Sequence, residues 1–175
     1  MVLKYKTEYW EWVFYKNLIG AVILFPFVQS YLRFFLAKEN AFATLLVLSL
    51  TMLFASWLLY MRRGQYYLID LGIVVFLAAI LFGFAVRKID PIVTVWFINT
   101  ALAILTFGYI LAKHLFAQTE RLFLKKWKEI IAGGLLATLL RITLAFAFLF
   151  FPLSLMVVLF TVSHIFIVAK FFEFK

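Results

Sequence analysis

Six long apolar runs constrain this chain more than any other feature. A membrane-spanning helix needs about 20 mostly apolar residues, because about 30 Å of hydrocarbon is crossed at about 1.5 Å per residue. The 175-residue chain holds runs of this length at about 17–36, 41–60, 67–86, 91–112, 131–150 and 153–170. Barrel strands would instead alternate apolar and polar residues over about 10 positions. The sequence therefore predicts an all-α, polytopic transmembrane helix bundle that forms one domain over residues 1–175.

Composition excludes the soluble classes of protein. The chain is 67% hydrophobic and 14% charged, whereas a soluble domain is about 45–50% apolar and about 25% charged. A sphere of this size cannot hide so much apolar surface from water. The net charge of +9 comes from Lys and Arg at the ends of the apolar runs. The predicted partners are therefore the lipid bilayer and its anionic headgroups, and not nucleic acid.

Positive charge in the connections predicts the orientation of the bundle, because cytoplasmic loops are enriched in Lys and Arg. With the N-terminus in the cytoplasm, four of the 17 basic residues lie outside, at Arg33, Lys38, Arg87 and Lys88. Arg141 lies within a span, and the remaining twelve lie inside. No cleavable signal peptide is visible, so the first span is expected to act as a signal anchor. We expect an integral protein of the plasma (inner) membrane with both termini cytoplasmic.

The longest connection predicts an amphipathic interfacial helix at about 119–130. Thr119 is the predicted N-cap, and Glu120 is favourably placed in the first turn. One face of this helix carries apolar residues at helical spacing, namely Phe116, Phe123, Trp127 and Ile130. The basic residues lie elsewhere, at Arg121, Lys125 and Lys128. The helix is interpreted as a membrane-surface anchor or, alternatively, as a docking site for a soluble or ATPase partner.

Aromatic residues before the first span predict a second interfacial anchor. They are Tyr5, Tyr9, Trp10, Trp12 and Tyr15. Tyr and Trp are enriched where a membrane meets water, because each has an apolar ring and a polar group.

Polar residues within the spans form the candidate site, because each of them is costly in lipid. Arg141 lies near the middle of the fifth span, where insertion of an Arg costs about 2.5–3.5 kcal/mol. His164 lies on the sixth span at a depth about 6 Å from that of Arg141, which an Arg side chain can bridge. Asp70 on the third span is the predicted counter-ion. Asn99 and Gln29 are the predicted hydrogen-bond partners.

Two interpretations of these polar residues stay open. In the first, they form a cluster inside the bundle that binds an anionic solute or headgroup, or relays protons through His164. In the second, Arg141 snorkels to the cytoplasmic headgroups, or pairs with Asp70 only to hold helices together.

Small residues at four-residue spacing predict where helices approach closely. The patterns are Ala79-x-x-x-Gly83, Gly133-x-x-x-Ala137 and Gly134-x-x-x-Thr138. Such patterns are also common by chance in apolar helices.

The motifs of membrane enzymes are missing from this sequence. It has no Cys, no His-Glu-x-x-His, no Gly-x-Ser-x-Gly and no phosphate-binding Gly loop. Its two His residues, His114 and His164, are on different helices and are interpreted as interfacial residues rather than haem ligands. We therefore expect no catalytic residues, no metal site, no cofactor and no enzymatic activity.

From the second span to the fifth, the chain resembles the intracellular septation protein A family of small bacterial inner-membrane proteins. The residues that carry this resemblance are Ser56-Trp57, Arg62-Arg63, Leu68–Phe84, Thr94-Val95 and Arg141–Phe146. The resemblance implies a non-enzymatic role in envelope maintenance or cell division through contacts with other membrane proteins. It also implies five spans, with Arg141 at the start of a long fifth helix.

Two functions follow as expectations. The first is a non-enzymatic membrane protein that acts through membrane-protein partners or as a homo-oligomer. The alternative is a small-solute or ion transporter, or the membrane substrate-binding subunit of a transporter, with a polar site around Arg141. Six spans with both termini inside also resemble, in architecture alone, the substrate-binding subunits of energy-coupling-factor transporters.

Overall fold

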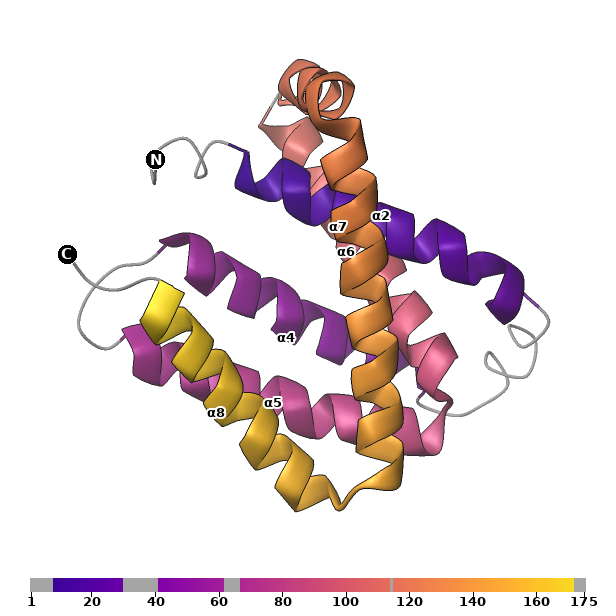
Figure 1. Cartoon of the computed structure of the whole chain (residues 1–175), viewed down its shortest axis with the longest axis vertical. Helices are drawn as coiled ribbons and strands as arrows, with labels where there is room; N and C mark the ends of the chain where they lie inside the picture. Colours follow the sequence, from indigo (N-terminus) through magenta and orange to yellow (C-terminus); the bar gives the residue numbers. More distant parts are fainter. Residues whose placement is uncertain (1–7, 30–40, 62–66, 114, 172–175) are drawn as a thin grey trace.

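A computed structural model describes residues 8–29, 41–61, 67–113 and 115–171, and it shows an all-helical bundle (Figure 1). Its helices are α2 (Tyr9–Val28), α4 (Ala41–Met61), α5 (Tyr67–Lys88), α6 (Pro91–Ala112), α7 (Phe116–Phe150) and α8 (Leu153–Phe171). Within the described ranges five of these helices are long and apolar enough to cross a membrane, and α8 contributes the shorter apolar stretch Leu153–Phe166. The predicted fold class is thereby confirmed. The cytoplasmic location of the N-terminus stays a prediction.

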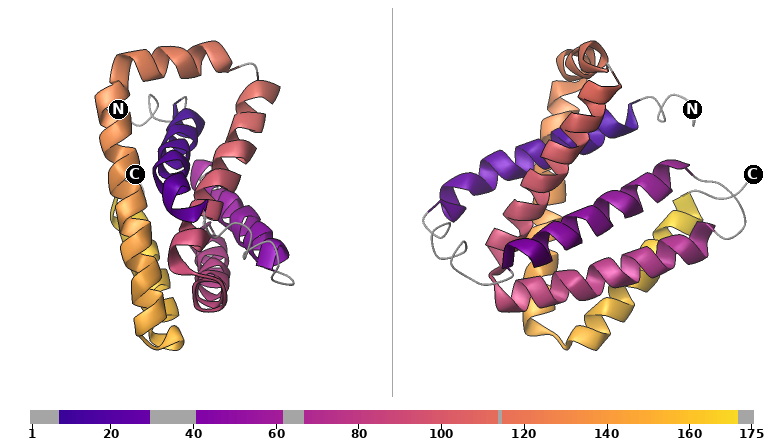
Figure 2. Two further views of the ribbon diagram at one scale, coloured as in Figure 1. Left: turned by 90° about the vertical axis from the view of Figure 1, so that its right-hand side faces the viewer. Right: turned by 180° about the vertical axis from the view of Figure 1, so that it is seen from behind.

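The helices of the bundle form two groups, and the middle helix of each group is α2 or α5. The helix α2 passes between α6 and α7, and α5 packs against both α4 and α8 (Figures 1 and 2). The tight packing of α7 on α2 depends on Gly134, where an added Cβ would lie 2.9 Å from Cβ of Ile19. Thr138, one turn further, is also buried. The predicted small-residue face Gly134-x-x-x-Thr138 is therefore a helix contact.

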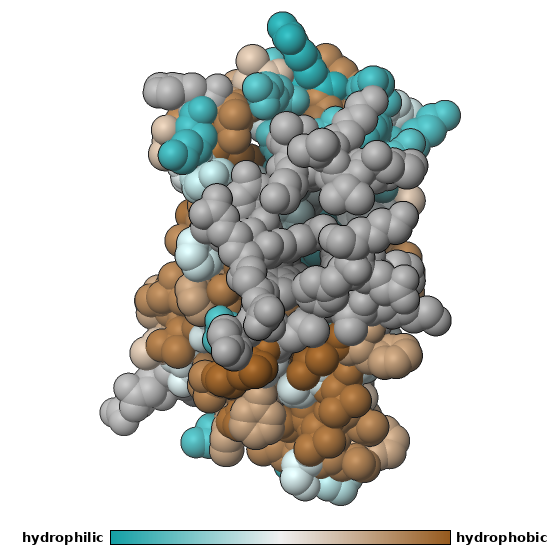
Figure 3. Space-filling model, turned by 90° about the vertical axis from the view of Figure 1, so that its left-hand side faces the viewer, coloured by the Kyte–Doolittle hydropathy of each residue, from teal (hydrophilic) through white to brown (hydrophobic). Residues whose placement is uncertain are grey.

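The outer surface of the bundle is strongly apolar. Large apolar side chains such as Ile104, Leu139 and Phe150 are each more than 60% exposed. Hydrophilic residues gather at the end that carries the first part of α7, and hydrophobic residues dominate the opposite end (Figure 3). Such a surface suits lipid contact rather than water.

The first helix begins earlier than predicted. The expected span was 17–36, but α2 runs from Tyr9 to Val28, and residues 30–40 lie outside the described part. The aromatic segment belongs to this helix because its side chains pack inside the bundle. Trp10 is buried with its ring 5.1 Å from that of Tyr109, and the Tyr15 hydroxyl donates to the Thr119 carbonyl at 3.0 Å. The interfacial role of these aromatic residues stays a prediction, and Tyr5 lies outside the described residues.

The predicted interfacial helix and the predicted fifth span are the two segments of α7, which meet at a kink. In α7, Lys126 has non-helical angles (φ −129°, ψ 25°), so a kink separates the first segment from the transmembrane part. The first segment crosses over the start of α2 (Figure 2, left). Thr119 is not the N-cap, because the helix starts at Phe116 and the Thr119 hydroxyl donates to the Leu115 carbonyl inside the first turns.

The predicted apolar face of this segment is divided by the kink. Phe116 and Trp127 are about half exposed, whereas Ile130 is buried and the ring of Phe123 lies 5.1 Å from that of Tyr15. The predicted basic residues are exposed, as expected for an interfacial helix, at Arg121, Lys125 and Lys128.

Candidate intramembrane anion site

Arg141 is held inside the bundle by two amide side chains. Its Nη1 donates to Oδ1 of Asn17 at 2.6 Å and to Oδ1 of Asn99. Both asparagines are fully buried, and they come from α2 and α6, the two helices that pack together beside α7. This position favours the first interpretation of Arg141, in which the guanidinium belongs to an internal polar cluster.

Local sequence explains how the amides reach Arg141. The Asn17 Nδ2 donates to the Val13 carbonyl one turn back, and its Oδ1 accepts from the guanidinium. At Gly20 an added Cβ would collide with the Asn99 amide and would lie 2.5 Å from Oγ1 of Thr138. Glycine at this position is therefore required for α2, α6 and α7 to approach closely enough for Arg141 to bond both asparagines.

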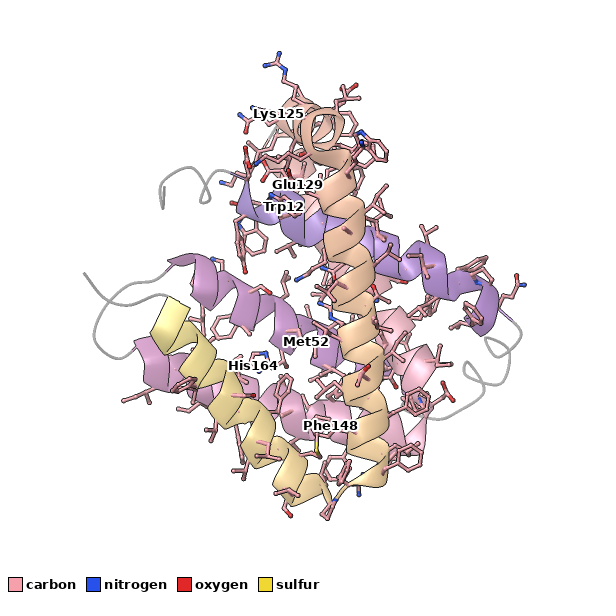
Figure 4. The ribbon with its side chains drawn as sticks, viewed as in Figure 1. Trp12, Met52, Lys125, Glu129, Phe148 and His164 are labelled. Carbon is pink, nitrogen blue, oxygen red and sulfur yellow. The ribbon has the colours of Figure 1, made fainter. Side chains whose placement is uncertain are left out.

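A cavity of about 400 Å³ lies beside Arg141 and is lined by residues of all six helices. Most of its wall is apolar, for example Met52 on α4, which lies across from His164 on α8 (Figure 4). Its polar lining residues are Lys16, Ser56, Arg141 and His164. The cavity is only partly enclosed, and α7 and α8 diverge from the turn at Phe151 and Pro152 (Figure 1).

The charges of the cavity are all positive. Among the described residues the one ion pair within 4 Å joins Lys126 to Glu8, so Arg141 and Lys16 have no carboxylate partner there. Two like charges repel, and burial removes the water that would screen them. The arrangement therefore places two basic side chains in one largely apolar wall.

The structure brings together three of the five predicted cluster residues. Arg141 bonds Asn99, and His164 lines the same cavity with its Nδ1 3.0 Å from the Phe160 carbonyl. The predicted role of Asp70 as counter-ion is wrong, because it is exposed in the first turn of α5 and makes no ion pair with Arg141. Gln29 is exposed at the end of α2, because this helix begins eight residues before the predicted start.

Sequence reasoning missed three polar residues of this region. Lys16 was counted as a cytoplasmic flanking charge, Asn17 as the first residue of a span, and Thr138 only as a small packing residue. The signal that could have found them is the spacing of Lys16, Asn17 and Gly20, which share one side of a helix if that helix begins before residue 17.

No protein-family model, no curated protein and no solved structure matches this chain. The resemblance to the septation family therefore stays a prediction. It places Arg141 at the start of the fifth helix, whereas Arg141 lies 15 residues beyond the kink of α7.

Proposed function

We propose that this protein binds a small organic anion with an apolar body in the Arg141 cavity, as a membrane transporter or as the membrane substrate-binding subunit of one. One observation carries the proposal: Arg141 and Lys16 share an apolar cavity that holds no carboxylate among the described residues that line it. Charged groups within a membrane domain are rare and commonly mark a substrate or ion pathway.

The cavity suits such a ligand in size and chemistry. Its volume of about 400 Å³ falls in the usual range for small-molecule sites, about 300–1,000 Å³. Apolar walls bind the body of the ligand, and the two cations bind its acid group. In the described part of the chain only Nη1 of Arg141 has hydrogen-bond partners. The guanidinium therefore has further donors for a carboxylate or phosphate.

The test compares an anion with its uncharged analogue. Equilibrium binding of radiolabelled decanoate and decanol is measured on the purified protein in detergent. We expect decanoate to bind more tightly than decanol, and Lys16→Met to weaken decanoate binding about tenfold, because one charged interaction is lost. Lys16 has no hydrogen bond in the described structure, so this variant leaves the Arg141 cluster in place.

Lys113→Met is the matched control, since Lys113 is exposed beyond the end of α6. Equal binding of decanoate and decanol, or unchanged binding in Lys16→Met, would refute the proposal. Uptake of decanoate into proteoliposomes then separates a complete transporter from a binding subunit.

A role through membrane-protein partners in envelope maintenance or division stays a prediction from the resemblance. It expects Arg141→Leu to leave the protein folded and to change no solute binding. The proposed function expects loss of decanoate binding in the same variant.

A further inference from the structure

A second cleft lies where the first segment of α7 crosses the start of α2. It has a volume of about 380 Å³ and is lined by Glu8, Glu11, Gln118, Arg121, Leu122 and Lys125. We call it the α2–α7 cleft. The two carboxylates come from the start of α2, and the two cations and the amide come from α7.

Glu11 is the unusual member of the α2–α7 cleft. Its side chain is 2% exposed, and its Oε2 is buried without a hydrogen-bond partner among the described residues. Glu8 differs, because its Oε2 accepts from Lys126 Nζ at 2.8 Å. A buried carboxylate oxygen with no partner is costly, so Glu11 points to a ligand that donates a hydrogen bond.

The opposite wall of the cleft is basic. Arg121 and Lys125 are one helical turn apart on α7 and are both exposed. Neither forms an ion pair with Glu8 or Glu11 in the described structure. The cleft thus keeps positive and negative groups apart, which suits a ligand that carries both charges rather than a metal ion or a simple anion.

The surroundings of the cleft suit the headgroup layer of a membrane. It is at the hydrophilic end of the molecule, where Lys125 and Glu129 project from α7 (Figures 3 and 4). On either side of the kink, α7 exposes Leu124 and Trp127, which are 70% and 48% exposed. A helix with exposed apolar and basic residues lies in the membrane interface.

We propose that the α2–α7 cleft binds a phosphoethanolamine group. A primary ammonium donates hydrogen bonds to Glu11 and Glu8, and a phosphate accepts them from Arg121 and Lys125. Phosphocholine cannot donate hydrogen bonds through its quaternary ammonium, and phosphoglycerol lacks the cation. The group comes from a membrane aminophospholipid or from a soluble phosphoethanolamine compound.

The test is native mass spectrometry of the detergent-solubilised protein, titrated with phosphatidylethanolamine, phosphatidylcholine and phosphatidylglycerol of identical acyl chains. We expect phosphatidylethanolamine to bind about tenfold more tightly than the other two lipids. Glu11→Gln should reduce its binding to the level of phosphatidylcholine. Arg121→Gln should weaken phosphatidylethanolamine and phosphatidylglycerol alike, because both carry the phosphate.

Glu129→Gln is the matched control, because Glu129 is an exposed carboxylate of α7 outside the cleft. Competition with glycerophosphoethanolamine identifies the source: displacement assigns the site to the soluble group, and its failure assigns the site to the lipid. Equal affinity for the three lipids, or unchanged binding in both Glu11→Gln and Arg121→Gln, overturns the proposal. Arg121 is exposed, so its variant remains informative if Glu11→Gln does not fold.

Discussion

Lys126 and Arg141 both lie on α7, but the two cations have different partners and different surroundings. Lys126, at the kink, pairs with Glu8 at 2.8 Å, and both side chains keep about a quarter of their surface exposed. Arg141, deeper in the bundle, bonds two neutral amides and faces an apolar cavity whose described lining holds no carboxylate. Near water a single ion pair contributes little to stability. In the bundle interior a cation without an anion is retained at a cost, and this cost is the reason to propose a functional role for Arg141.

The largest expected effect concerns the glycine that allows the Arg141 cluster to form. Gly20→Ala places a Cβ against Asn99 and Thr138, so we expect the free energy of unfolding to fall by about 3 kcal/mol, as in overpacked cores. Thermal or denaturant unfolding in detergent measures this change. Gly108→Ala on α6 is the control, because no atom of the described residues lies within 4 Å of its added Cβ. Similar free energies of unfolding for the two variants would show that the surroundings of Gly20 are loosely packed.

The next prediction tests the coupling between Arg141 and the amide of Asn99. Asn99→Leu leaves the Arg141 guanidinium with one amide fewer, and we expect a loss of about 2 kcal/mol in the free energy of unfolding. Arg141→Leu, which strands Asn17 and Asn99, should cost a similar amount. The free energy of unfolding of the double variant should fall by at least about 1 kcal/mol less than the sum of the two single losses. The reason is that the double variant leaves fewer buried polar groups without a hydrogen-bond partner.

Thr143→Val serves as the control for this cycle, because Thr143 is exposed on α7 and, among the described residues, bonds only the Leu139 carbonyl. Additive losses in the double variant would contradict a direct coupling of Arg141 to Asn99.

The smallest effect is expected at the kink. Lys126→Gln removes the ion pair with Glu8, and we expect a change in the free energy of unfolding of at most about 1 kcal/mol, which added salt diminishes. The measurement is unfolding at low and high ionic strength. If Lys126→Gln destabilised the protein as much as Asn99→Leu, this would contradict the difference that we infer between the contributions of Lys126 and Arg141 to stability.

The sequence predicted the bounds of a span correctly where these bounds depend only on the residues of that span. The expected runs 41–60, 67–86, 91–112 and 153–170 end within two residues of α4, α5, α6 and α8, because length and continuous apolarity decide where a span lies. The first span was misplaced, because its helix runs from Tyr9 to Val28. There, polar and aromatic residues continue the helix because they pack on neighbouring helices, as Trp10 does on Tyr109.

The candidate site was only half predictable for the same reason. The depth of Arg141, His164 and Asn99 follows from their positions along the spans, and these three residues do lie together. Depth does not say which way a side chain faces, so Asp70 was included although it is exposed. Lys16 and Asn17 were excluded from the site because the first helix was expected to begin at residue 17.

The sequence by itself determined that this protein is a bundle of apolar helices with an arginine near the middle of one span, because the hydrocarbon thickness sets span length. The tertiary structure decided which groups surround that arginine. Helix rotation and crossing depend on close contacts such as those at Gly20 and Gly134. Those contacts bring Asn17, Asn99 and Lys16 from distant parts of the chain to Arg141, and no pattern within a single span records them.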